Sequence, residues 1–183
     1  MSLMSILENN PVIPVVSIDT LESAYLYFDK LREKNIKIIE LTLRSKNALN
    51  IVDKLINHPD FNDFIIGVGT ITSIDQMKTC HEMGARFQVS PGFTPMLLEH
   101  AKINKINYLP GVITPHEVMT LQSFGFNCAK FFPAGAMNGL QVLKSYLSVF
   151  PDMKFCVTGG INEQNKSQYL ALDNIIAIGS SSI

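Results

Sequence analysis

The sequence lacks the features that would attach a protein to a membrane, a secretion route or a nucleic acid. No stretch approaches the ~18 consecutive apolar residues of a membrane span, and residues 1–8 have neither a basic beginning nor a sustained apolar run. The 15 Lys and Arg residues against 16 Asp and Glu residues give a net charge of −1, so no basic surface is expected. We therefore expect a cytoplasmic protein with small-molecule partners, and no nucleic acid or membrane among them.

Cysteine and histidine are also scarce. The three cysteines, Cys80, Cys128 and Cys156, are odd in number, far apart and without a Cys-x-x-Cys pairing, which excludes a disulfide framework and predicts buried, reduced thiols. The four histidines form neither a His-Glu-x-x-His motif nor a Cys/His cluster. We expect no catalytic metal and no cofactor.

What the sequence does have is a regular alternation of short apolar runs with longer stretches of helical period. The near-continuous apolar character of the runs is typical of parallel strands covered on both faces. Eight strand-plus-helix units predict an α/β fold, a (β/α)₈ TIM barrel in one domain spanning residues 1–183. The predicted strands are residues 12–17, 38–43, 65–69, 87–90, 108–111, 129–132, 155–157 and 175–178.

Helix-capping residues follow the ends of several predicted strands. Thr20 precedes one helix, and Ser73 and Thr114 each begin a capping box, while Asn162 is predicted to cap the helix after the seventh strand. Only residues 179–183 follow the eighth strand, so the barrel is predicted to lack its final helix. Either a partner subunit covers that side or the helix is missing from this form of the chain.

Lys130 is the first candidate for chemistry. It lies late in the sixth predicted strand among apolar side chains, whereas Lys37 and Lys154 lie at strand beginnings. Active sites of such barrels lie at the C-terminal ends of the strands, and desolvation there favours a neutral amine that can attack a carbonyl. From the local sequence alone, a lysine that reaches the barrel mouth or pairs with an acid is equally compatible.

Three polar residues share one face of the second strand. Glu40, Thr42 and Arg44 alternate with apolar residues, so they point to the barrel axis when helices pack outside. A buried carboxylate near Lys130 could move protons, and an arginine at the rim could bind a substrate carboxylate. The alternative is a structural Glu40–Arg44 ion pair that fills the barrel.

Glycine-rich strand ends indicate ligand contact. Thr70 follows two glycines of the third strand, and the segments 158–160 and 179–181 follow the seventh and eighth strands. The loops at these last two positions, with a helix N-terminus, form the recurrent phosphate site of this fold. Either glycine turn alone would be an ordinary strand exit.

Read together, these motifs resemble the bacterial 2-keto-3-deoxy-6-phosphogluconate (KDPG) aldolases, a family that also cleaves 4-hydroxy-2-oxoglutarate. The resemblance runs in unbroken order from Pro11 to Ser181 and rests on residues 39–44, 67–70, 89–92, 109–111, 130–134 and 158–161. It implies a class I aldolase, a carbon–carbon lyase that forms a Schiff base without a cofactor. It also implies a 2-keto acid substrate, a role in the Entner–Doudoroff pathway and a homotrimer.

The resemblance also implies roles for individual residues. Lys130 matches the Schiff-base lysine, Glu40 the general acid/base, and Arg44 with Thr70 the binders of the pyruvate carboxylate. The remaining implied site residues are the phosphate ligands Gly159, Gly160 and Ser181, the stereochemical reader Thr158, and the pocket residue Phe132. Ser180 departs from the family pattern, which has glycine there and so no Cβ near the phosphate.

Three other readings stay open at this point. One is a related 2-keto-3-deoxy-6-phosphogalactonate aldolase, and another is a non-catalytic barrel that binds a phosphorylated metabolite. The third is a thiamine-phosphate synthase or phosphate-binding isomerase, which shares the glycine-rich strand ends. This third class does not need the trio of Lys130, Glu40 and Arg44.

Overall fold

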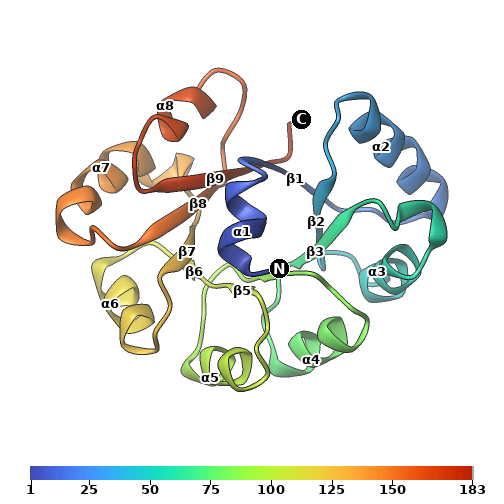
Figure 1. The fold of residues 1–183 in the computed structure, drawn as a ribbon, viewed down its shortest axis with the longest axis horizontal. Coiled ribbons are helices and arrows are strands. Elements are labelled where there is room, and N and C mark those ends of the chain that lie inside the picture. Colours follow the sequence, from blue (N-terminus) through green and yellow to red (C-terminus); the bar gives the residue numbers. More distant parts are fainter. Residues whose placement is uncertain (183) are drawn as a thin grey trace.

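The computed structural model describes residues 1–182 and shows a nearly closed barrel of parallel strands ringed by helices (Figure 1). The sheet order is β5-β4-β3-β2-β1-β9-β8-β7-β6. This confirms the predicted α/β barrel and most strand positions to within a few residues. The strands are β1 Val12–Val16, β2 Ile38–Thr42, β3 Ile65–Gly69, β4 Gln88–Val89, β5 Tyr108–Leu109, β6 Gly111–Val112, β7 Cys128–Phe131, β8 Lys154–Thr158 and β9 Ile175–Ser180.

The predicted count of eight strands is wrong by one, because the fifth run is divided at Pro110. Leu109 pairs with β4 on one side, whereas Gly111 pairs with β7 on the other. Pro110 has no N–H to donate to a ladder, although its carbonyl accepts a 2.8 Å hydrogen bond from Lys130 N. The two halves of the predicted strand, β5 and β6, therefore pair with different neighbours and form the two ends of the sheet. The chain at Pro110 connects these two ends.

Helices cover the outside of the barrel (Figure 1). Thr20 caps the first of them, and both capping boxes are present, with Ser73 bonded to Gln76 and Thr114 to Glu117. These three predictions are confirmed. The helices are α2 Leu21–Glu33, α3 Ala48–Ile56, α4 Ile74–Glu82, α5 Pro95–Ile103, α6 Pro115–Ser123, α7 Gly139–Val149 and α8 Lys166–Leu170, with short 3₁₀ turns at η1 Pro59–Phe61 and η2 Gly135–Met137.

The prediction that Asn162 caps the helix after the seventh unit is wrong. Helix α8 begins only at Lys166, with Asn165 at the N-cap position. The Asn162 N–H donates to Asn165 Oδ1, and Asn162 Oδ1 accepts from the Gln164 N–H, both at 2.9 Å. The two asparagines therefore stabilise a turn ahead of the helix, which competes with an earlier helix start.

A helix that the sequence analysis did not predict, α1 Leu3–Glu8, lies across the barrel at its axis (Figure 1). Its buried side chains, Ile6 and Leu7, belong to a cluster with residues inside the barrel, among them Ile13, Phe87 and Ala177. Ser2 caps it by accepting a hydrogen bond from the Ser5 N–H. Helix α1 therefore closes the end of the barrel where the strands begin.

In residues 1–182 no helix follows β9, as the sequence predicted. β9 pairs directly with β1, and the C-terminal end lies between α8 and α2 (Figure 1). The ring of strands therefore passes from β9 to β1 without a covering helix from the described part of the chain.

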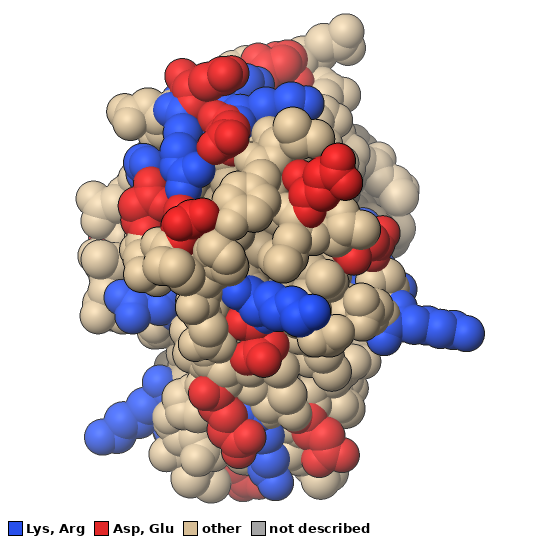
Figure 2. Space-filling view, turned by 90° about the vertical axis from the view of Figure 1, so that its right-hand side faces the viewer, with Lys and Arg blue, Asp and Glu red and all other residues tan. Residues whose placement is uncertain are grey.

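The surface shows no segregation of charge on the face that carries α2 and α3, where acidic and basic side chains are interspersed (Figure 2). Arg32 contacts both Asp29 and Asp63 there, and Lys37 also binds Asp63. Of the helices within residues 1–182, none has the length and apolar character needed to cross a membrane.

The prediction of buried, reduced cysteines is confirmed. Cys80, Cys128 and Cys156 are free thiols inside the protein. Burial raises the pKa of Cys80 and of Cys128 to about 12, so both stay protonated at neutral pH.

Helix α1 provides a test of how much the closed end stabilises the barrel. Leu7 is fully buried, so we expect Leu7→Ala to lower the free energy of unfolding by about 2–5 kcal/mol. Leu26→Ala is the matched control, because Leu26 lies on α2 with 63% of its surface exposed, and its cost should stay near 0.5 kcal/mol. Urea unfolding measures both. Equal costs would show that α1 does not support the barrel.

Candidate active site

Lys130 and Glu40 meet inside the barrel. Lys130 lies on β7 with 6% of its surface exposed, and Glu40 lies on β2 with 3% exposed. Lys130 Nζ is 3.6 Å from Glu40 Oε1. A buried charge without a partner is strongly destabilising, so each side chain offsets the burial of the other. In residues 1–182, Glu40 Oε1 accepts no hydrogen bond, which leaves it able to take one from a ligand.

The two-residue period of β7 explains why Lys130 points inward. Ala129 and Phe131 belong to the large core between strands and helices, while Cys128 belongs to the cluster inside the barrel. Lys130 pairs in register with Cys156 of β8, another member of that inner cluster. The amine therefore lies above an apolar layer, and its Nζ is 5.1 Å from the centre of the Phe132 ring.

Gly69 makes the space that the Glu40 carboxylate occupies. A Cβ at position 69 would lie 2.0 Å from Glu40 Oε1 and 2.7 Å from its Cδ. Residue 69 ends β3, which pairs with β2 along its whole length. Only glycine lets the carboxylate lie across β3 toward Lys130.

The three polar residues predicted to share one face of β2 have different surroundings in the structure. Thr42 forms a 2.6 Å hydrogen bond with Ser17, which connects β2 to the segment after β1. Arg44 lies beyond the strand end and is exposed. The alternative of a Glu40–Arg44 structural pair is wrong, because Glu40 faces Lys130 and Arg44 forms no ion pair within residues 1–182.

Thr70 follows β3 with φ at +67°, in the left-handed region. This conformation costs a β-branched residue roughly 1–2 kcal/mol, and such strain is concentrated at functional sites. Thr70 lies at the C-terminal end of β3, the end of the barrel where Arg44 follows β2. Sequence alone could suggest the position but not the strain.

A cavity of about 80 Å³ opens at the C-terminal ends of β7, β8 and β9. It brings together most of the predicted site residues, whereas Glu40, which contacts Lys130, and Thr70 are not part of the lining. The predicted residues that line it are Arg44, Lys130, Phe132, Thr158, Gly159, Gly160 and Ser181; Val15, Ile161, Gly179 and Ser180 line it as well.

Residues 158–160, at the end of β8, form one wall of this cavity. Gly159 and Gly160 have φ values of +89° and +79°, which L side chains rarely adopt, so the turn requires glycine. Thr158 is buried, and its Oγ1 has no hydrogen-bond partner within the described chain. The predicted contribution of a helix N-terminus is wrong, since α8 starts only at Lys166. The turn itself supplies the backbone groups that face the cavity.

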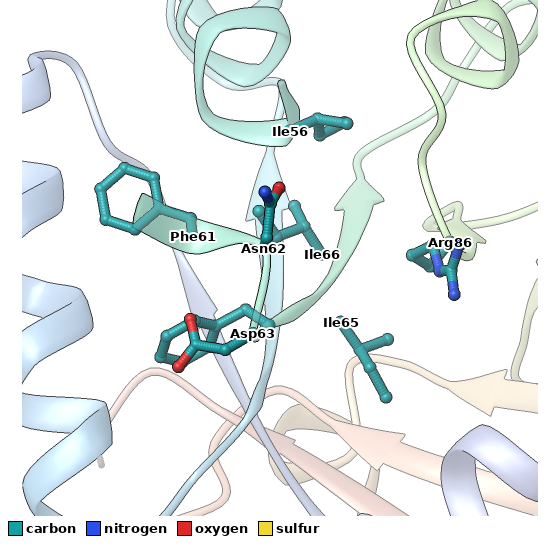
Figure 3. A pocket seen from close by; sticks show the side chains of 8 residues that line it. Ile56, Phe61, Asn62, Asp63, Ile65, Ile66 and Arg86 are labelled. Carbon is teal, nitrogen blue, oxygen red and sulfur yellow. The ribbon is translucent and has the colours of Figure 1, made fainter. Parts of the chain in front are cut away.

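A larger cavity, of about 270 Å³, lies at the opposite end of the barrel (Figure 3). Its lining includes Ile65 at the start of β3, Arg86 before β4 and the carboxylate of Asp63. Hydrogen bonds from Lys37 and Arg32 to that carboxylate hold the pKa of Asp63 below its usual value. Barrels of this kind react at the C-terminal ends of their strands, so this cavity is not the candidate active site. No cluster of three or more His, Cys, Asp or Glu side chains suited to a metal ion occurs in residues 1–182.

Comparison with known proteins agrees with this geometry. The family model of KDPG and KHG aldolases matches residues 3–183. The chain belongs to this aldolase family. Its curated relatives include the KHG/KDPG aldolase of Escherichia coli K12, 35% identical over 97% of this chain and 82% of the relative. The 2-dehydro-3-deoxy-phosphogluconate aldolase of Dickeya dadantii is 37% identical over 96% of this chain and 82% of the relative.

Solved structures of aldolases have the same fold. The KDPG aldolase of Legionella pneumophila, with pyruvate captured as a covalent carbinolamine, matches with a TM-score of 0.93 and 39% identity over 99% of this chain and 87% of that one. The aldolase of Zymomonas mobilis ZM4, with 3-phosphoglycerate, has a TM-score of 0.91 and 34% identity over 98% of this chain and 84% of that one.

A double-mutant cycle tests whether Gly69 makes room for Glu40 in this aldolase. We expect Gly69→Ala to lower the free energy of unfolding by about 1–3 kcal/mol, because the methyl group displaces a buried carboxylate. In a Glu40→Ala background no carboxylate is displaced, so the added cost should fall below about 0.5 kcal/mol. Chemical denaturation of the four proteins measures the coupling. The same cost in both backgrounds would contradict the assignment.

Proposed function

We propose that the chain is a class I aldolase that reversibly cleaves 2-keto-3-deoxy-6-phosphogluconate to pyruvate and glyceraldehyde 3-phosphate. One observation carries the proposal, namely the buried Lys130 amine, which lines the cavity and lies 3.6 Å from Glu40. The covalent pyruvate carbinolamine in the Legionella pneumophila relative supports it.

The first stage joins the substrate to Lys130. The Lys130 ammonium first passes a proton to Glu40, and the neutral amine attacks the C2 ketone. The resulting carbinolamine takes that proton back from Glu40 on its oxygen, which leaves as water to give an iminium ion. Glu40 is close enough to take a proton from the nitrogen and to return one to the departing oxygen. The positive iminium then lies beside the Glu40 carboxylate, which stabilises it in a site with little water.

The second stage breaks the C3–C4 bond. Glu40, through a water molecule, takes the proton of the C4 hydroxyl, and the electrons of the C3–C4 bond move to the iminium nitrogen. Glyceraldehyde 3-phosphate leaves, and an enamine stays on Lys130. Glu40 returns a proton to C3, and hydrolysis of the iminium releases pyruvate and the free amine. These steps use no metal or cofactor.

The remaining site residues bind the two ends of the substrate. We assign the pyruvate carboxylate to Arg44 and Thr70, since a guanidinium and a hydroxyl at the rim are suited to a carboxylate. Thr158 can bind a substrate hydroxyl through its unpartnered Oγ1, and Phe132 packs against the bound chain. The phosphate ligands in this assignment are Gly159, Gly160 and Ser181.

We propose 4-hydroxy-2-oxoglutarate as a second substrate of the same site. Its cleavage to pyruvate and glyoxylate uses the same bonds at C2, C3 and C4. The Escherichia coli relative is named for both activities, and a further structural neighbour, 33% identical with a TM-score of 0.88, is described as a 4-hydroxy-2-oxoglutarate and KDPG aldolase. The cavity of about 80 Å³ fits a small aldehyde product.

We further propose that residues 1–183 form one catalytic domain, that the enzyme is cytoplasmic and that it assembles as a homotrimer. Large apolar side chains exposed on α5 and α6 support an assembled state, among them Met96, Ile103 and Met119. Sedimentation velocity of the purified protein measures the assembly.

Lys130 and Lys154 provide a matched pair of variants. Lys130→Met removes the nucleophile, so we expect cleavage of KDPG to fall at least 1,000-fold, on the order of a lost covalent step. Lys154→Met lies at the opposite end of the barrel, where its amine donates to the Asp173 carbonyl, and should keep most of the activity. Steady-state assays of both proteins compare them. Equal losses would contradict the role of Lys130.

Covalent trapping separates the aldolase from a non-catalytic binding protein. After incubation with pyruvate and reduction with borohydride, peptide mass spectrometry should find a stable adduct on Lys130. Absence of an adduct would overturn the Schiff-base mechanism, and an adduct on another lysine would overturn the site.

Thr70 is expected to combine a cost in stability with a benefit in binding. Thr70→Gly relieves the left-handed strain, so we expect a gain of about 0.5–1 kcal/mol in the free energy of unfolding. The loss of the hydroxyl should weaken pyruvate binding about tenfold. Asn35→Gly is the control, since Asn35 is also left-handed at +56° but exposed after α2. It should stabilise slightly and leave pyruvate binding as it is, and a matching loss in both variants would exclude a specific role for Thr70.

A further inference from the structure

Two hydroxyl groups connect the end of β2 to the segment after β1. Thr42 is the last residue of β2 and is buried, and Ser17 directly follows β1. The Thr42 hydroxyl donates to the Val16 carbonyl at 3.3 Å, so Ser17 is the donor in the 2.6 Å hydrogen bond between the two hydroxyls. Thr42 therefore has no proton left to donate to a ligand.

The other side of the same strand end is connected to β3. Thr42 pairs in register with Gly69, and the Leu43 N–H donates to the Gly69 carbonyl at 2.9 Å. Arg44 and Thr70, to which we assign the pyruvate carboxylate, are each the next residue along the chain from this bonded pair. The spacing between the two proposed carboxylate ligands therefore depends on how the ends of β2 and β3 are held.

Arg44 has little other support for its position. Its side chain lines the cavity, and within residues 1–182 its guanidinium forms no ion pair. The backbone that carries a free side chain limits the region that the side chain can reach. A backbone already fixed in the binding conformation lowers the free energy cost of binding, whereas a loose one must be ordered by the ligand. Loss of a contact at the end of β2 should therefore weaken carboxylate binding and leave the chemistry of Lys130 intact.

We propose that Thr42, held by Ser17, is a positioning residue that fixes the end of β2 so that Arg44 binds the carboxylate of the keto acid. The inference rests on the proposed function and assigns two further residues to it. In the described part of the chain neither Thr42 nor Ser17 lines the cavity, so in this assignment neither contacts the substrate. Both act on the affinity for the carboxylate through Arg44.

The test compares two ketones, pyruvate and hydroxyacetone, which share the reacting carbonyl group and differ in the carboxylate. Each is trapped on Lys130 with borohydride, and the second-order rate constant of trapping is measured at low ketone concentration. For Thr42→Val we expect this constant to fall about fivefold for pyruvate and less than about 1.5-fold for hydroxyacetone. At saturating pyruvate the trapping rate should stay within about twofold of the wild-type rate, because the nucleophile is unchanged.

Further variants test the connection between the two hydroxyls. Ser17→Ala should lower the second-order constant for pyruvate about threefold, and because Ser17 is exposed this variant keeps the test valid if Thr42→Val does not fold. Thr42→Ser keeps the hydroxyl and should restore trapping to within about twofold of wild type. The double variant of Thr42→Val with Ser17→Ala should be no slower than Thr42→Val alone, since Ser17 acts through Thr42.

Two controls separate positioning from general damage. In an Arg44→Ala background, Thr42→Val should change pyruvate trapping less than about 1.5-fold, because the guanidinium that it positions is gone. Ser23→Ala removes another exposed serine whose hydroxyl bonds to a threonine hydroxyl, that of Thr20 at 3.0 Å, and it should leave trapping of both ketones at the wild-type level.

The outcomes distinguish this inference from the proposed function. A loss that is confined to pyruvate and disappears in the Arg44→Ala background supports the positioning role. An equal loss for both ketones, a loss that persists without Arg44, or unchanged trapping in Thr42→Val and Ser17→Ala would each overturn it, even where the wild-type protein traps pyruvate on Lys130. Absence of that adduct from the wild-type protein would instead overturn the aldolase assignment.

Discussion

The buried pairing of Lys130 with Glu40 is the constraint on which the rest of the site depends. An amine and a carboxylate inside a barrel are tolerated because each offsets the desolvation of the other. The pair needs a glycine at position 69, an apolar layer beneath it and open space above it. In the mechanism that we propose, the same proximity lets a proton pass between Lys130, the substrate and the Glu40 carboxylate. The contact that stabilises the buried pair would then also serve the reaction.

The two ends of the barrel are built for different purposes. At the end where the strands begin, α1 and the inner apolar cluster close the barrel around Ile6 and Leu7. At the other end, glycine turns and strained backbone expose polar groups to a cavity. The apolar end supplies stability, which permits unfavourable conformations such as that of Thr70 at the polar end.

The sequence predicted what depends on periodicity and local chemistry. Strand positions, three helix caps and the inward direction of Lys130 follow from patterns that repeat over a few residues. Features that depend on distant partners could not be read in the same way. The division at Pro110 needs β4 and β7 on either side, and the contact of Glu40 with Lys130 rather than Arg44 depends on barrel geometry. Helix α1 was missed because six residues are too few for a clear helical period, although Ser2 with Leu3, Ile6 and Leu7 is a signal that could have found it.

The pairing of β1 with β9 has a consequence for the order in which the molecule forms. Every other ladder joins strands that are near neighbours in the sequence, whereas this one joins the first strand to the last. During synthesis the intermediate sheet therefore has two open edges, and the partners of Ile6 and Leu7 inside the barrel are incomplete until Ala177 is in place. The closing contact also joins the strands that are farthest apart in the sequence and so costs the most loop entropy. We therefore expect the interior of the barrel, and with it the surroundings of Lys130, to form late in folding.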